Sequence, residues 1–228
     1  MSMRTAAILC VVGLMCLLTW ALNDESSANK ELEQAANVIQ QMTTGTAGIP
    51  DSVLRGAKCI AVVPHMVKGA FIVGAQHGRG VATCRSSSGW SAPAPFELSG
   101  GSIGLQAGGQ SSDVVLMVMN QDGMAQLMSG HFKVGADASV AAGPVGRSGS
   151  ADAGWKAAIL TYASSKGAFA GVDVSGAAIT QDKKATQNLY GRDVPFADIL
   201  KGQVQPSGAA QTFVTTVQNA QQSASARH

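Results

Sequence analysis

Short runs of apolar, often β-branched residues, separated by glycine and other turn-forming residues, dominate the stretch between Cys59 and Met119. Runs of this length and spacing are typical of strands, and the unbroken run Val114–Met119 predicts a strand that is buried on both faces. Few charges (13%) and 27 glycines fit closely packed strands with tight turns. We expect an α+β fold, in which helices at both ends flank a twisted, mostly antiparallel sheet of about seven or eight strands that curls toward a barrel.

Helical periodicity flanks these strand runs. An apolar stripe between residues 24 and 44 predicts an amphipathic helix, formed by Leu32, Ala35, Ala36, Ile39 and Met42. This helix either packs on the domain or inserts into a bilayer, and its acidic polar face favours packing. Shorter helices are expected at residues 51–57, 122–131, 182–190 and 196–200. Residues 203–228 are rich in Gln, Ala and Ser, which predicts a disordered or weakly helical tail.

The first 21 residues have the pattern of a secretory signal peptide. Arg4 precedes an apolar run, Ala6–Leu18, and Ala21 supplies a small residue at a cleavage point. The run is shorter than the about 20 residues of a membrane span, although an uncleaved anchor is the rival interpretation. We therefore expect an exported protein, periplasmic or envelope-associated. Its expected segments are a signal peptide (1–21), an N-terminal helix (22–48), a binding domain (49–202) and the tail (203–228).

Two cysteines, Cys59 and Cys84, lie beyond the signal peptide. In an oxidising compartment they could form a disulfide, and they could equally be two small buried side chains. The sequence leaves both readings open. Neither cysteine belongs to a C-x-x-C motif, and the four histidines form no H-x-x-x-H pair, so we expect no metal site and no cofactor.

One catalytic motif is present, because Gly100-Gly101-Ser102-Ile103-Gly104 fits the G-x-S-x-G pattern of serine hydrolases. That chemistry needs the serine on a sharp turn between a strand and a helix. Leu105-Gln106-Ala107-Gly108-Gly109 follows, which is a poor helix start. A hydrolase using Ser102 is therefore only the third hypothesis, and we expect no catalytic residue and no enzyme activity.

Basic residues outnumber acidic ones in one part of the chain. Between Arg55 and Gln110 there are five basic residues (Arg55, Lys58, Lys68, Arg79 and Arg85) and one acidic residue, Glu97. This asymmetry is typical of an anion-binding face or of an ordinary solvated surface. The formal net charge of the whole chain is only +2, which argues against nucleic acid as a partner.

Several glycine-containing blocks follow one another in a fixed order between Ile49 and Gly191. The clearest are Lys68-Gly69-x-Phe71-Ile72-Val73-Gly74, Gly100-Gly101-Ser102-Ile103-Gly104-x-Gln106 and Phe132-Lys133-x-Gly135-x-Asp137-Ala138-Ser139. Others lie at residues 49–58, 78–81, 89–93, 108–113, 118–120, 143–147, 162, 167–172 and 190–191. In these blocks, over about 140 residues, the chain resembles the SYLF domain family. Two positions depart from the family pattern: Cys59, where glycine is frequent, and His77, where tyrosine is common.

The resemblance implies a lipid-binding domain, found in bacterial exported proteins and also joined to SH3 or FYVE modules in eukaryotes, including a yeast actin-patch protein. Eukaryotic members bind phosphoinositides and some bind actin. For this chain we expect non-catalytic binding of anionic phospholipid at a membrane surface of the cell envelope. Lysine and arginine suit phosphate oxygens, and the candidate headgroup contacts are Lys58, Lys68, Arg79 and Arg85. The alternative is a structural or interaction protein of the envelope that binds a protein partner.

Overall fold

The computed structural model describes residues 27–44, 48–70, 73–103, 108–144, 157–165, 168–170 and 174–227. The predicted signal peptide, with Cys10 and Cys16, lies outside these ranges. Within them, no helix combines the length and the hydropathy that a membrane crossing requires.

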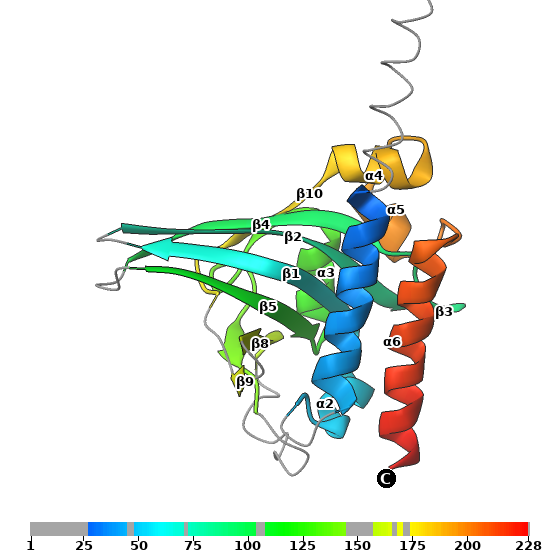
Figure 1. Cartoon of the computed structure of the whole chain (residues 1–228). Helices are drawn as coiled ribbons and strands as arrows, with labels where there is room; N and C mark the ends of the chain where they lie inside the picture. The colour runs from blue at the N-terminus through cyan, green and yellow to red at the C-terminus, as the bar shows by residue number, and fades with distance from the viewer. Residues whose placement is uncertain are drawn as a thin grey trace, which may run out of the picture.

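A ten-stranded sheet forms the centre of the molecule (Figure 1). Eight strands follow one another in the order β6-β10-β4-β2-β1-β5-β8-β7, while β3 pairs with β2 and β9 with β8. Every strand pair is antiparallel except β7–β8, which is parallel. The strands are β1 (Cys59–Ala70), β2 (Val73–Ser86), β3 (Gly89–Trp90), β4 (Ala94–Ile103), β5 (Gly108–Val118), β6 (His131–Lys133), β7 (Val140–Ala142), β8 (Ile159–Ser165), β9 (Ala168–Ala170) and β10 (Ala178–Gln181). The predicted α+β fold, with a curled and mostly antiparallel sheet, is confirmed.

Helices stand at both ends of the chain, as the periodicity predicts. The N-terminal helix spans residues 27–44. The others are α2 (Asp51–Gly56), α3 (Gln121–Met128), α4 (Lys183–Tyr190), α5 (Phe196–Leu200) and α6 (Ala209–Ala226). Side-chain caps set two of the boundaries: the Gly123 amide donates to Asn120 Oδ1 (2.9 Å), and the Ala185 amide donates to Asp182 Oδ1 (2.8 Å). Each cap satisfies an amide that has no partner inside the helix.

The sheet separates two apolar cores. On one face, the N-terminal helix, α2 and α6 cover β-strand residues such as Val62 and Val115. On the other face, Phe96 and Leu98 of β4 pack with Phe132 and Phe196. The N-terminal helix and α6 lie side by side across the first face (Figure 1). The apolar stripe of the N-terminal helix is therefore buried against the domain, which agrees with the packed interpretation.

Residues 203–228, which were expected to be disordered or weakly helical, are mostly an ordered helix. Residues Ala209–Ala226 form the 18-residue helix α6. Its buried side chains recur at helical spacing: Ala210, Phe213, Val214, Val217 and Ala224. A single aromatic side chain and two valines, placed on one face, bury enough apolar surface to order a segment whose overall composition is polar.

The long strands change their surroundings halfway along. In β1 the register slips between Val62 and Val67 against β2, and between Val63 and Met66 against β5, which identifies a bulge. Beyond this bulge β4, β2, β1 and β5 run on past the helices as a four-stranded projection (Figure 1). We call this projection the blade and define it as residues 65–70, 73–79, 97–103 and 108–113. The remaining, helix-covered part of the same sheet is called the base.

Candidate functional site

The four predicted headgroup residues do not come together in one place. Lys58 and Arg85 lie in the base, where the Arg85 amide donates to the Lys58 carbonyl (2.8 Å). Lys68 lies in the blade, ten residues further along β1, and Arg79 lies where the blade meets the base. A strand rises about 3.3 Å per residue, so Lys58 and Lys68 are separated by roughly 30 Å, several times the Debye length of ~8 Å.

Arg85 is engaged in holding the base together. Its Nε donates to the Ala57 carbonyl (2.7 Å) and its Nη2 to the Arg55 carbonyl (2.8 Å), at the C-terminal end of α2. The guanidinium also stacks over the Trp90 ring at 5.2 Å from the ring centroid. Partial burial lowers the pKa of Arg85 below its ordinary value. A cation at this end of a helix stabilises the carbonyl-rich terminus, so the geometry gives Arg85 a structural task.

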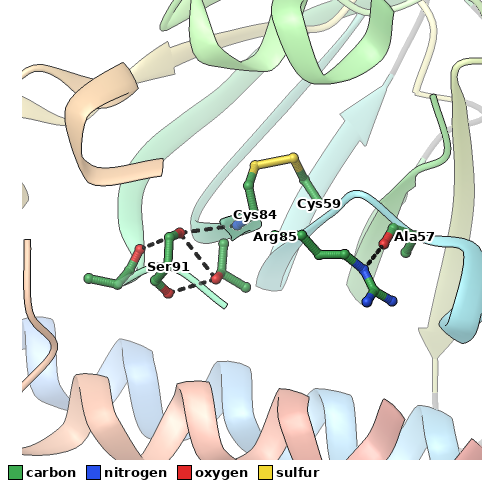
Figure 2. The surroundings of a disulfide bond; sticks show 7 residues. Ala57, Cys59, Cys84, Arg85 and Ser91 are labelled. Carbon is green, nitrogen blue, oxygen red and sulfur yellow. Dashed lines mark hydrogen bonds between the residues drawn. A yellow bond between two sulfur atoms is a disulfide. The ribbon is translucent and has the colours of Figure 1, made fainter. Parts of the chain in front are cut away.

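A disulfide lies beside Arg85. Cys59 and Cys84 face each other across β1 and β2 and are bonded, with their Cα atoms 4.0 Å apart. Figure 2 shows the bridge in the sheet, with the Arg85 side chain turned toward Ala57. Just after β3, Ser91 Oγ accepts from the Cys84 amide (3.1 Å). Of the two interpretations left open by the sequence, the structure has the bridge.

Arg79 is surrounded by carboxylates. Its Nε lies 3.6 Å from Glu97 Oε1 and 3.9 Å from Asp182 Oδ2. Glu31 of the N-terminal helix lines the same cavity as Arg79 and Asp182. Burial raises the pKa of Glu31 from its ordinary 4.5 to about 7, with Arg79 lowering it and the two acids raising it further. Arg79 is therefore already paired within the protein.

The backbone at Ser102 is part of a strand. It belongs to β4 and is opposite Gly74 of β2 in the antiparallel register. The next described element is another strand, β5, so the strand-to-helix turn that a serine nucleophile needs is missing among the described residues. Within the same residues, no cluster of three or more His, Cys, Asp and Glu side chains could hold a metal ion.

One face of the blade is open, and the residue-by-residue reasoning from sequence missed it. Exposed and buried residues alternate along β2, from exposed Ala75 to buried Gly80, and along β1, where Met66 is buried and Val67 is 54% exposed. Cross-strand pairing puts Val67 beside His77 and Ser111, and His77 beside Ser99. We call this surface the open face: Val67, Gly69, Ala75, His77, Ser99, Gly101 and Ser111.

The open face continues the sheet surface that the helices cover in the base. Along β2, Val81 contacts the core beneath the N-terminal helix, and Arg79, His77 and Ala75 follow at every second position. Among the described residues, Val67 is the single exposed large apolar side chain. The alternating exposure was the available signal, but the region's many glycines hide it in the sequence, since glycine has no side chain to mark a face.

Comparisons with known proteins match most of the chain. The Ysc84 family, described as "Las17-binding protein actin regulator", matches residues 99–220. LAS seventeen-binding protein 3 of Saccharomyces cerevisiae is 34% identical over 195 residues, which cover 80% of this chain and 42% of that protein. The human SH3 domain-containing YSC84-like protein 1 is 31% identical over 188 residues, covering 78% of this chain and 54% of that protein. The chain thus spans about half the length of these curated relatives. No solved structure matches it.

Proposed function

Because the chain belongs to the Ysc84 family, the family of the SYLF domain, we propose that it is a non-enzymatic interaction protein that binds a protein partner through the open face of the blade. The observation that carries this proposal is the contrast along one sheet surface. Three helices cover that surface in the base, whereas the open-face residues of the blade are exposed. The name of the yeast relative LAS seventeen-binding protein 3 supports a protein partner.

The chemistry of the open face favours a protein over a lipid headgroup. Its side chains are small and uncharged around Val67, with His77 as the one titratable group. A sheet surface of small residues allows close approach of another backbone, and an apolar side chain at its centre gains affinity when it is desolvated. The four expected headgroup cations are spread over the molecule, and two of them bond to other parts of the protein.

We also propose that the protein acts in an oxidising compartment after export. The N-terminal sequence pattern and the Cys59–Cys84 bridge both support this proposal, because disulfides persist in such compartments. N-terminal sequencing of the protein from its host should then begin near Leu22 or Asn29. Intact Met1 on protein from the cytoplasm would contradict export.

The binding proposal is tested by photo-crosslinking in the native host. A photoreactive amino acid at position 67 should give an adduct with one identifiable protein, and the same group at Gln211, exposed on α6, should not. The identified protein is then purified, and its Kd is measured. Val67→Glu should weaken binding at least tenfold, since it buries an unpaired charge, whereas Gln211→Glu should leave the Kd unchanged.

A liposome-binding experiment distinguishes the protein-partner function from lipid-headgroup binding. Wild-type protein and Lys68→Ala/Arg79→Ala are co-sedimented with anionic and with neutral liposomes at low and high salt. Salt-sensitive binding to anionic liposomes alone, weakened in the double variant and unaffected by Val67→Glu, would overturn the protein-partner proposal and restore the headgroup site.

A further inference from the structure

The start of the N-terminal helix rests where the blade joins the base. Two cavities of about 50 and 250 Å³ lie there, and Ser27, Glu31 and Arg79 line both of them. The smaller one is completed by the start of α4, with Asp182 and Lys184. The larger one is completed by Lys30, Gln34, Pro64 and His65. Figure 1 shows this end of the helix beside α4. The start of the helix therefore contacts the sheet around two cavities that charged side chains line.

Two carboxylates approach one guanidinium at this contact, and a third lines the cavities beside it. Glu97 and Asp182 each approach Arg79 Nε within 4 Å, from β4 and from the start of α4. Glu31 of the N-terminal helix lines both cavities together with Arg79. The other charged or titratable groups that line the two cavities are Lys30, Lys184 and His65. Ionised Glu31 thus adds a third negative charge beside an arginine that already has two acidic partners.

We propose that Glu31, Arg79, Glu97 and Asp182 form a pH-sensitive latch, which holds the start of the N-terminal helix on the sheet in mildly acidic solution and loosens it as the solution becomes alkaline. Protonated Glu31 places a neutral carboxyl in the contact. Ionised Glu31 has to be desolvated there next to Glu97 and Asp182, and release of the helix start returns its charge to water.

The sign follows from linkage. The pKa of Glu31 is about 7 in the folded protein and 4.5 in the ordinary, solvated state. Its contribution to holding the helix start is therefore fully present below pH 4.5 and is lost as the pH rises through 7. Between pH 6 and pH 8 this difference increases the equilibrium constant for opening up to about tenfold.

Loosening would enlarge the uncovered sheet surface. Residues 27–31 lie beside Pro64 and Arg79, directly next to the open face. Their release extends that face toward the base, while the rest of the helix stays anchored by Leu32, Ile39 and Met42, which are at most 1% exposed. The latch acts on the helix whatever the partner of the blade is.

Hydrogen–deuterium exchange of a peptide covering residues 28–36 tests the latch. After correction for the intrinsic pH dependence of exchange, its protection in wild-type protein should fall up to about tenfold from pH 6 to pH 8. Glu31→Gln should abolish this fall, because its amide stays neutral. Glu33→Gln is the matched control, with the same charge change at an exposed position of the same helix, and should keep the fall.

Carbon NMR of the Glu31 carboxyl gives a second readout, independent of helix opening. A titration midpoint near 7 supports the latch, and a midpoint near 4.5 overturns it. The proposal is equally overturned by corrected protection that does not change with pH in wild-type protein, or by a pH-dependent fall that persists in Glu31→Gln.

Discussion

Base and blade are two halves of the same four strands in different surroundings. In the base, β1 residues from Cys59 to Val63 are all buried, because helices and smaller strands cover both faces of the sheet. In the blade, the same strand alternates between buried Met66 and exposed Val67. The strand pattern alone does not decide which surface is open. The helices decide it, since the strands of the blade run on past the N-terminal helix, which lies between the blade and α6 (Figure 1).

The largest expected difference is in packing. Phe96 is fully buried in the base, so Phe96→Ala should lower the free energy of unfolding by about 3–5 kcal/mol. Val67→Ala, in the open face, should change it by less than about 0.5 kcal/mol. Urea denaturation of both variants measures the contrast. Similar losses for the two would mean that the blade surface is covered in the free protein.

The disulfide should contribute the next largest effect. The bridge joins residues 25 apart in sequence, and removing such a cross-link typically lowers the free energy of unfolding by about 3 kcal/mol. Cys59→Ala/Cys84→Ala should lose this amount, as should wild-type protein denatured with a reductant present. The loss belongs to the base, so Val67-dependent binding should survive in the folded variant. Unchanged stability of the double variant would show that the thiols are not bridged in solution.

The sequence predicted the architecture because apolar periodicity reports burial directly. The run Val114–Met119 indicated a strand buried on both faces, and all its residues are buried. The sequence pattern failed at α6, where five small or apolar side chains are buried and order a segment of polar composition. The sequence also could not predict that Cys59 pairs with Cys84. Their cross-strand register depends on a bulge, and no local motif in the sequence marks this bulge.

The candidate site was harder to predict than the fold. Charge counting along the chain selected Arg79 and Arg85. The carbonyls of Arg55 and Ala57 bind Arg85, and the carboxylate of Asp182 pairs with Arg79. These partners are distant in sequence or in another element. The open face depends on which residues the helices leave uncovered. That is a property of the packed molecule, so the identity of Val67 or His77 does not reveal it.

Arg85 and Lys68 provide a smaller, direct comparison of two predicted headgroup residues. Arg85→Ala removes two hydrogen bonds to carbonyls at the end of α2 and should lower the free energy of unfolding by about 2 kcal/mol. Lys68→Ala, in the blade, should stay within about 0.5 kcal/mol. Thermal and urea unfolding measure both. Equal stability of Arg85→Ala and wild-type protein would mean that Arg85 has no structural role and is available to bind a ligand.

The smallest predicted effect concerns the bulge that divides base from blade. His65 has a φ of 52°, a left-handed conformation that costs a non-glycine residue about 1 kcal/mol. Asp113 Oδ1 fixes this conformation by accepting the His65 amide (2.9 Å), and that bond survives any side-chain change at position 65. His65→Gly removes the strain but also increases the conformational entropy of the unfolded chain. The free energy of unfolding should therefore rise by no more than about 0.5 kcal/mol.

A second variant at position 65 tests whether the left-handed conformation is what affects stability. His65→Val puts a β-branched side chain into the same conformation and should lower the free energy of unfolding by about 1–2 kcal/mol. Urea denaturation of both variants is the measurement. If valine is tolerated as well as glycine, the backbone at position 65 relaxes in solution, and the bulge cannot be what sets the blade apart from the base. If only glycine is tolerated, the left-handed residue and its Asp113 bond fix the point at which the sheet leaves its helices.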